Sequence, residues 1–437
     1  MNTNINNKVE EYMDAYAACG YFNGSVLVAY KGSILLSKGY GLANIECHTP
    51  NSPQTKFRIA SLTKAFTSMA IMQLEEKGFL QVSDPLSKYI PDYPLGEQIT
   101  LHHLLTHSSG ITNYTSFPHF DHKIRPFIWT LENLIDEFKH YPLEFNPGES
   151  QAYCNSGYIL LSFIIEQISG QTYSDYLRDY IFRPLGMKDS GVDLGRKIVL
   201  NRADGYNLDK EFIHTVVNNM SSMVGAGGVY TTVEDLYLWD RALYTDALVN
   251  KETLQRIFTP YFASYGGYGW DVSHFDIHDQ PKKRMAHYGD VEGFVSYFTR
   301  YVEDDLTVIV LSNTMIAPVQ EINNTLAKIV FGYEISAPII PAFIEDPNKH
   351  EYAREYAREG AESEKINLTF EEDNLYLSSN GTDRYPVNPV HRHDHAIDYI
   401  AEYMNERLTF LLNDCNKVTQ VIYTNANGDA NLYGRSV

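Results

Sequence analysis

The sequence lacks the long hydrophobic stretch that a transmembrane helix requires. Its longest apolar segment, residues 158–168, is interrupted by Ser162 and Glu166 and is shorter than the roughly 20 residues that span a bilayer. The first twenty residues are polar and lack the basic end and apolar core of a signal peptide. The printed sequence therefore predicts no membrane span, and a cytoplasmic location, or an extracytoplasmic one if a signal peptide has been removed.

Cysteine and basic residues are also scarce. Cys19, Cys47, Cys154 and Cys415 show neither CxxC spacing nor the density of a disulfide scaffold, so we expect four free thiols. The chain has 35 Lys and Arg against 55 Asp and Glu, a net charge of −20, and no basic cluster. Such a surface repels phosphate backbones, so nucleic acid is not an expected partner.

The length of 437 residues predicts a large catalytic-sized domain with a smaller appendage. Residues 337–348, APIIPAFIEDPN, are proline-rich and precede a charged run, which indicates a linker. Beyond it, short β-rich segments alternate with Asn and Gly turns. We therefore expect one domain over residues 1–335 and a small β-rich domain over residues 345–437.

Two remote segments are typical of β-hairpins. Residues 23–41 contain two β-rich runs around Lys31 and Gly32, and residues 293–313 contain a similar pair. Hairpins of this kind can share one antiparallel sheet. Between them the periodicity predicts helices over residues 62–77, 100–105, 131–140, 156–168 and 232–243.

The segment SLTK places Ser61 and Lys64 three residues apart at the start of an apolar helix, so the two side chains share one face. A serine hydroxyl becomes a good nucleophile when a neighbouring base takes its proton, and a lysine can serve if burial lowers its pKa. The helix N-terminus adds dipoles that can stabilise an oxyanion. An isolated SxxK also occurs as a helix cap with an exposed lysine, so this motif alone decides nothing.

A second motif, YCN, lies just ahead of an apolar helix. Tyr153 and Asn155 project to the same side of an extended segment, and Cys154 points the other way, towards a core. Tyr153 could relay a proton to or from Ser61, and Asn155 could hold a substrate carbonyl and orient Lys64. The alternative is that Tyr153 is one more half-buried tyrosine among 33.

A third motif, HYGD, leads into the later hairpin. Gly289 would let the backbone approach a ligand closely, and the N–H of Asp290 could pair with that of Ser61 as an oxyanion hole. His287 taken alone would more often be a packed or surface histidine.

In this order and spacing, the three motifs resemble the SxxK, YxN and KTG or HxG motifs of the serine penicillin-recognising enzymes: class C β-lactamases, low-molecular-weight DD-peptidases and their esterase relatives. Further segments that are similar in sequence to this family lie at residues 101–111, 146–158, 183–187, 225–236 and 287–294. The resemblance covers roughly residues 20–333. It implies a β-lactamase/transpeptidase-like α/β (α+β) fold, an antiparallel sheet flanked by helices with an all-helical subdomain. The tail resembles the small β-barrel domain of some penicillin-binding-protein-like hydrolases.

Carried over by position, the resemblance implies roles for each motif. Ser61 would be the acylated nucleophile, with Lys64 and Tyr153 as the proton-transfer pair. Asn155 would bind the substrate carbonyl, and the N–H groups of Ser61 and Asp290 would form the oxyanion hole. His287 and Gly289 would line the cleft.

Two positions depart from the family pattern. His287 replaces the lysine of KTG, and an imidazole near neutral pH is only partly charged, so potent β-lactamase activity is less expected. Asp290 puts a carboxylate beside the proposed oxyanion hole, where it either points away from the cleft or repels anionic substrates.

Two groups of histidines invite other interpretations. His391, His393 and His395 share a strand face, so zinc is conceivable, but such clusters are usually solvated and no fourth ligand can be named. For the other group we expect a structural role beneath the cleft; it comprises His102, His103 and His107. We expect no metal and no cofactor.

The leading hypothesis is a metal-independent serine hydrolase that acts through an acyl-enzyme on an amide or ester, with a D-amino-acid-containing peptide as the expected substrate. One alternative is a carboxylesterase of the same family. Another is a non-catalytic protein that binds or senses cell-wall peptides or β-lactams. The expected partners are a small peptide, β-lactam or ester; the natural substrate, the oligomeric state and the role of the C-terminal domain stay open.

Overall fold

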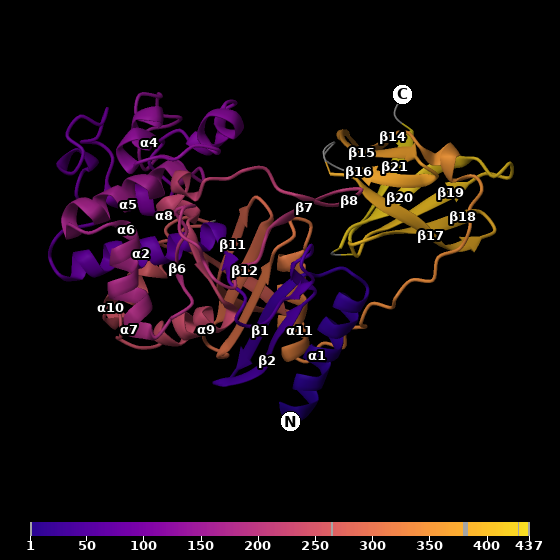
Figure 1. Ribbon diagram of the computed structural model, residues 1–437, viewed down its shortest axis with the longest axis horizontal. Helices are drawn as coiled ribbons and strands as arrows, with labels where there is room; N and C mark the ends of the chain where they lie inside the picture. The colour runs from indigo at the N-terminus through magenta and orange to yellow at the C-terminus, as the bar shows by residue number, and fades with distance from the viewer. Residues whose placement is uncertain (1, 264, 379–382, 427, 436–437) are drawn as a thin grey trace.

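Six antiparallel strands form the central sheet of the molecule (Figure 1). The computed structural model describes residues 2–263, 265–378, 383–426 and 428–435. The strands lie in the order β10 (Asp271–Ile277), β11 (Gln280–Val291), β12 (Phe294–Tyr301), β13 (Leu306–Ser312), β1 (Gly24–Tyr30) and β2 (Ser33–Tyr40). Because β1 pairs with β13, the prediction that the two remote hairpins share one antiparallel sheet is confirmed.

Both faces of this sheet are covered by helices. Val26 and Val28 pack in one cluster with residues of α1 (Asn2–Ala18) and α11 (Val319–Val330), whereas Leu27 packs in a second cluster with the helical region. Successive side chains of a strand point to opposite faces, so β1 contributes to both cores. Every residue of β12 and β13 is buried, which accounts for the mainly apolar sequence of β13, whereas β12 also buries Ser296, Thr299 and Arg300.

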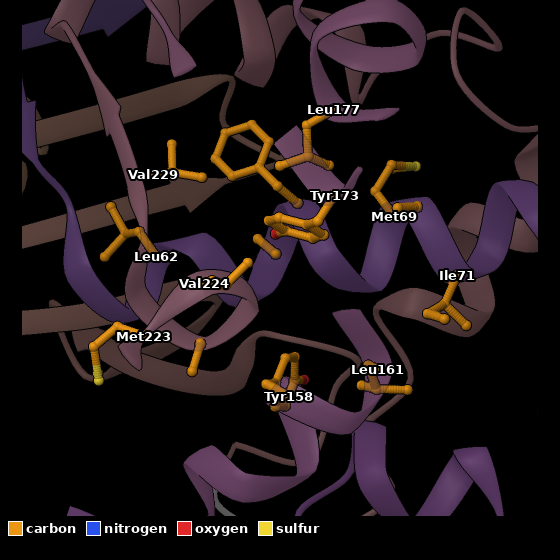
Figure 2. Packing of buried hydrophobic residues seen from close by; sticks show 14 of the residues in the cluster. Leu62, Met69, Ile71, Tyr158, Leu161, Tyr173, Leu177, Met223, Val224 and Val229 are labelled. Carbon is orange, nitrogen blue, oxygen red and sulfur yellow. The ribbon is translucent and has the colours of Figure 1, made fainter. Parts of the chain in front are cut away.

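A helical region packs against one face of the sheet around α2 (Thr63–Glu76) and α5 (Asn155–Ser169). Figure 2 shows part of its core, with Met69, Tyr158 and Tyr173 among the labelled residues. Further helices are α3 (Leu101–Leu105), α4 (Leu131–Phe138), α6 (Tyr173–Leu177), α7 (Arg183–Leu185), α8 (Val224–Gly227), α9 (Val233–Ala242) and α10 (Lys251–Ile257). Short strands are β3 (Leu42–Asn44), β4 (Thr49–Pro50), β5 (Phe57–Arg58), β6 (Gly191–Val192) and β9 (Val229–Thr231). The five predicted helices end within two residues of the expected positions.

The C-terminal part is a closed antiparallel barrel, so the expected small barrel-like domain is confirmed. Its strands are β14 (Glu355–Arg358), β15 (Ala361–Glu371), β16 (Asn374–Ser378), β17 (Tyr385–His393), β18 (Ala396–Ala401), β19 (Arg407–Leu412), β20 (Val418–Thr424) and β21 (Ala430–Arg435). Residues 333–346, without helix or strand, connect it to α11 where the linker was expected. The domain limits at 335 and 345 stay predictions. In the described chain no helix combines the length and apolarity needed to cross a membrane.

A hairpin from the first part of the chain reaches the barrel. It consists of β7 (Tyr206–Asp209) and β8 (Glu211–His214), and Figure 1 shows it extending towards the barrel strands. The Arg384 guanidinium donates to both carboxylate oxygens of Asp209, at 2.7 and 3.0 Å. The rings of Phe212 and Tyr403 lie 5.0 Å apart between centroids. The barrel is thus held by side-chain contacts as well as by the linker.

Candidate active site

Ser61 lies in a single 3₁₀ turn, Ala60–Leu62, that leads from β5 into α2. The preceding residue, Ala60, is buried and has a φ of 47°. This left-handed conformation costs a residue with a Cβ on the order of 1 kcal/mol or more, and it persists only where the surrounding structure enforces it. The sharp turn leaves Ser61 lining a cleft at the start of the helix.

Lys64 is fully buried in the first turn of α2, and its amine meets three oxygen atoms. Nζ lies 3.1 Å from Ser61 Oγ, 2.8 Å from Asn155 Oδ1 and 2.8 Å from the carbonyl oxygen of Ala226. The last two oxygens can only accept hydrogen bonds. A neutral amine has two N–H groups and one lone pair, so donation to both carbonyls leaves the lone pair for the Ser61 hydroxyl.

The orientation of Asn155 is fixed by its neighbours. Its Nδ2 donates to Thr115 Oγ1 at 3.0 Å, and Thr115 Oγ1 donates to Asn113 Oδ1 at 3.1 Å. Because the amide nitrogen has this acceptor, the amide oxygen faces Lys64. The backbone N–H of Asn155 also donates to Asn113 Oδ1, at 3.0 Å, which anchors the start of α5.

Burial lowers the pKa of Lys64 to about 7, although the negative charge of Asp290 and the Cys154 thiol act in the opposite direction. An amine with a pKa near 7 is partly neutral at neutral pH, which a base for a serine hydroxyl requires. The Nζ atom lies 4.7 Å from the centroid of the Tyr153 ring, so a cation–π contact also favours its charged form.

Tyr153 lies in the extended segment before α5 and packs against His107, with ring centroids 4.5 Å apart and an interplanar angle of 29°. His107 fixes this segment by two hydrogen bonds: its Nδ1 accepts the N–H of Cys154 at 3.0 Å, and its carbonyl accepts the N–H of Ala152. Burial raises the pKa of Tyr153 well above its usual value, partly offset by a hydrogen bond with Ser61. Tyr153 therefore keeps its proton and can act as a donor.

His287 on β11 is buried behind Tyr153, with the ring centroids 6.5 Å apart. Its Nδ1 donates to the carbonyl of Tyr288 at 2.5 Å. Burial, together with the positive charge of Lys64, lowers the pKa of His287 to about 3. The imidazole is therefore neutral at neutral pH, not partly charged as expected. Its Nε2 has no hydrogen-bond partner among the described residues.

Gly289 brings β11 against the backbone of Ser61. A Cβ at this position would lie 2.4 Å from the carbonyl oxygen of Ile59 and 3.1 Å from the amide nitrogen of Ser61. On the neighbouring strand, Ser296 Oγ donates to the same Ile59 carbonyl at 2.9 Å. This close approach is what two backbone N–H groups, of Ser61 and Asp290, need in order to serve one oxyanion.

Asp290 is among the residues that line the cleft with Ser61, and repulsion of anionic substrates by its carboxylate stays a prediction. The cleft has a volume of about 210 Å³. Burial raises the pKa of the Asp290 carboxyl, while the charge of Lys64 lowers it. Glu292 follows at the rim, where Oε1 lies 2.5 Å from Nη1 of Arg125. Two carboxylates thus line the cleft: that of Glu292 is paired with Arg125, and that of Asp290 lies near Ser61.

The remaining histidines contact other parts of the fold. His103 caps α3 with Thr100, and His102 Nδ1 lies 2.8 Å from the hydroxyl of Tyr268, so with His107 they have the structural contacts that were expected. On the barrel, the rings of His391 and His393 meet edge to face with centroids 4.3 Å apart, and His393 Nε2 lies 3.2 Å from Asp398. Over the described ranges, no three His, Cys, Asp or Glu side chains form a metal-ligating group.

The structure brings the predicted site residues together from three distant segments. Ser61, Tyr153, Asn155 and Asp290 line one cleft, whereas His287 and Gly289 are buried beside it and do not line it as expected. Ser61, Lys64, Tyr153 and Asn155 contact one another directly or through Lys64, and β11 closes the other side. Sequence reasoning missed the carbonyl of Ala226 as an amine partner. Ala226 lies in the GAGG segment, and the similarity of this segment to the family sequence was the signal that could have indicated it. It also missed further lining residues, among them Thr115, Arg125 and Glu292.

The sequence and the fold of the chain are similar to those of known proteins. The family model described as Beta-lactamase matches residues 5–330. Penicillin-binding protein 4* of Bacillus subtilis (strain 168) is 30% identical over 401 residues, covering 84% of this chain and 86% of that protein. The teichoic acid D-alanine hydrolase of Staphylococcus aureus (strain MRSA252) is 28% identical, covering 70% and 75%. The octameric penicillin-binding protein homologue from Pyrococcus abyssi aligns with a TM-score of 0.67 at 26% identity, covering 98% of this chain and 99% of that one.

Proposed function

The chain belongs to the Beta-lactamase family of serine hydrolases, and on this premise we propose that it cleaves an amide or ester through an acyl-enzyme on Ser61. The family resemblance inferred from the three motifs is thereby confirmed. One observation carries the proposal: the buried amine of Lys64, with its pKa lowered to about 7, lies 3.1 Å from Ser61 Oγ. A purely binding protein has no use for a nucleophile and a matched base.

The proposed reaction has two halves, acylation of Ser61 and hydrolysis of the acyl-enzyme. Lys64 Nζ accepts the Ser61 proton while Oγ bonds to the substrate carbonyl carbon, and the N–H groups of Ser61 and Asp290 stabilise the oxyanion. Tyr153 gives its proton to the leaving amine or alkoxide as the C–N or C–O bond breaks, and the Lys64 ammonium reprotonates Tyr153. In the second half Lys64 accepts a proton from water as its oxygen bonds to the acyl carbon. Tyr153 then protonates Ser61 Oγ as the acyl C–Oγ bond breaks, the Lys64 ammonium reprotonates Tyr153, and the acid leaves.

The charges around the cleft favour a substrate without an anionic group near the scissile bond. Asp290 contributes a carboxylate beside Ser61, and neutral His287 supplies no cation in place of the usual lysine. A free ammonium on the acyl group would instead be attracted to Asp290. A D-alanyl group, named in the teichoic acid D-alanine hydrolase relative, has such an amine when unacylated. We therefore propose D-aminoacyl amides or esters, including D-amino-acid-containing peptides, ahead of β-lactams.

A carboxylesterase is the second candidate, and the neutral charge of His287 favours it. A simple ester needs no cation for a terminal carboxylate. Comparing kcat/KM for a p-nitrophenyl ester and for D-alaninamide, a D-aminoacyl amide without a carboxylate, separates the two activities. Ester turnover with no measurable amide turnover would establish the esterase.

The nucleophile is tested by intact-protein mass spectrometry after treatment with a fluorophosphonate and with a labelled penicillin. We expect a covalent adduct on wild type with at least the fluorophosphonate, and none on Ser61→Ala. Ser83→Ala, an exposed serine, is the matched control and should be labelled as wild type is. Folded wild type that neither reagent labels, or Ser61→Ala that retains turnover of the substrate panel, would overturn the proposal and favour the non-catalytic binding protein.

A further inference from the structure

A second cavity lies on the same side of the sheet but shares no lining residue with the Ser61 cleft. Its volume is about 680 Å³, against about 210 Å³ for the cleft. The walls come from the segment that follows α9, from α10 and the segment after it, and from β11 and the end of β12. This cavity has no part in the proposed hydrolysis, so its size needs a separate explanation.

The cavity contains a buried arginine. Arg300 is 1% exposed, and its Cζ lies 4.6 Å from the Tyr244 ring centroid and 5.4 Å from that of Phe258. Its Nε donates to Asp240 Oδ1 at 2.8 Å, and Nη2 has a long contact of 3.4 Å with the Asp240 carbonyl. A guanidinium has five N–H donors. Among the described residues Nη1 has no hydrogen-bond partner, so its N–H groups are left to donate to a ligand.

The charge of Arg300 is only partly balanced by its neighbour. The buried carboxylate of Asp240 also accepts hydrogen bonds from Arg241, at 2.5 and 3.0 Å, and from Thr307 at 2.8 Å. One carboxylate therefore serves two guanidinium groups, although Arg241 also pairs with Asp305 at 2.7 Å. Arg300 retains the capacity to pair with a second anion.

Two lysines add positive charge to the lining. Lys251 and Lys283 have no ion-pair partner in the described part of the chain, and Asp246 is the one acidic residue that lines the cavity. A cavity with this excess of cations is unusual in a chain of net charge −20. Fields of one sign in a concave site with apolar walls raise the local concentration of the opposite charge.

The rest of the lining is largely apolar, with Leu243, Leu254, Phe258, Met285 and Val302 forming walls. A pocket of several hundred Å³ with apolar walls and a few convergent polar groups is the usual form of a small-molecule site. A planar guanidinium edge matches a carboxylate in two hydrogen bonds.

We propose that this cavity binds a small organic carboxylate with an apolar body. The carboxylate pairs with Arg300 and Lys283, and the hydrocarbon lies against Leu254 and Met285. This inference goes beyond the proposed hydrolase activity and does not depend on Ser61.

The test is isothermal titration calorimetry with octanoate, and with 1-octanol as the uncharged probe of the same chain length. Wild type and Ser61→Ala should bind octanoate equally, which separates this cavity from the catalytic cleft. Lys283→Gln should weaken octanoate about tenfold, the loss of one charge-assisted contact worth ~1.4 kcal/mol. Leu254→Trp should abolish binding by filling the cavity.

Lys282→Gln is the matched control, because Lys282 neighbours Lys283 on β11 but pairs with Asp304 and does not line the cavity. It should bind octanoate as wild type does. Absence of octanoate binding to wild type, equal binding of 1-octanol, or binding unaffected by Lys283→Gln would each overturn the proposal. Lys283 is partly exposed, so its substitution leaves the fold intact even if Leu254→Trp does not.

Discussion

At the scale of single residues, the protonation of Lys64 decides whether Ser61 can be activated. Three acceptors surround an amine that is shielded from water, and shielding disfavours the charged form more than those contacts favour it. The neutral form is populated above the lowered pKa, and the Tyr153 phenol stays protonated far beyond it. Activity should therefore depend on one ionisation across the neutral range.

The first prediction follows from this ionisation. For a neutral ester, kcat/KM should rise with pH through an apparent pKa near 7 and then reach a plateau, because Lys64 must lose its proton to act. Lys64→Arg should reduce kcat by roughly 10²–10⁴, since a guanidinium stays protonated. Lys77→Arg, at the exposed end of the same helix, is the control and should leave the rate unchanged. A flat wild-type profile between about pH 5 and pH 9 would contradict the assignment of Lys64 as base.

The second prediction concerns the carboxylate of Asp290. Asp290→Asn should raise kcat/KM for an anionic substrate and lower it for one with an ammonium, each by roughly five- to tenfold, because one charge beside the cleft is removed. Assays at the pH plateau should leave a neutral ester within about twofold of wild type, since the backbone N–H is retained. In Asp290→Asn the rise of kcat/KM with pH should occur at lower pH than in wild type, because the charge of Asp290 raises the pKa of Lys64. Equal changes for all three substrates would show that Asp290 does not select charge.

At the scale of elements, the approach of β11 to the turn before α2 sets the geometry of the oxyanion hole. The third prediction is that Gly289→Ala lowers kcat about 10²-fold, because its Cβ would clash with the Ile59 carbonyl and move β11 away from Ser61. Steady-state kinetics and thermal unfolding measure the effect. Gly434→Ala is the control, since that strand glycine meets only Glu359, at 3.7 Å. Wild-type kcat in Gly289→Ala would mean that the close approach is not required.

Elements and motifs that depend on local spacing could be predicted from the sequence. The helix of Lys64 and the two hairpins follow from periodicity, and the SxxK spacing places two side chains on one helix face. The neutral state of His287 could not be predicted, because it depends on burial produced by distant segments. The same holds for the Ala226 carbonyl beside Lys64 and for the left-handed backbone of Ala60.

At the scale of the whole molecule, the hairpin of β7 and β8 joins the cleft rim to the barrel. At one end Asn207 Nδ2 lies 3.4 Å from Glu292 Oε2 at the rim, and two residues further Asp209 pairs with Arg384 of the barrel. A short antiparallel hairpin is stiff enough to transmit its position only while both ends are held. Sequence alone could not predict this link, because its two partners are 175 residues apart.

The fourth prediction tests whether the barrel positions the cleft rim. Arg384→Ala should raise KM about two- to fivefold with little change in kcat, because the rim moves while Ser61 and Lys64 stay in place. The unfolding temperature should change little, since partly exposed ion pairs contribute roughly 0–1 kcal/mol. Arg358→Ala is the control, because it removes a surface ion pair with Glu364 between two residues of the barrel. It should leave KM unchanged. Equal KM values in both variants would show that the barrel does not act through this hairpin, whereas an intermediate KM for Arg384→Lys would tie the effect to the two-pronged contact with Asp209.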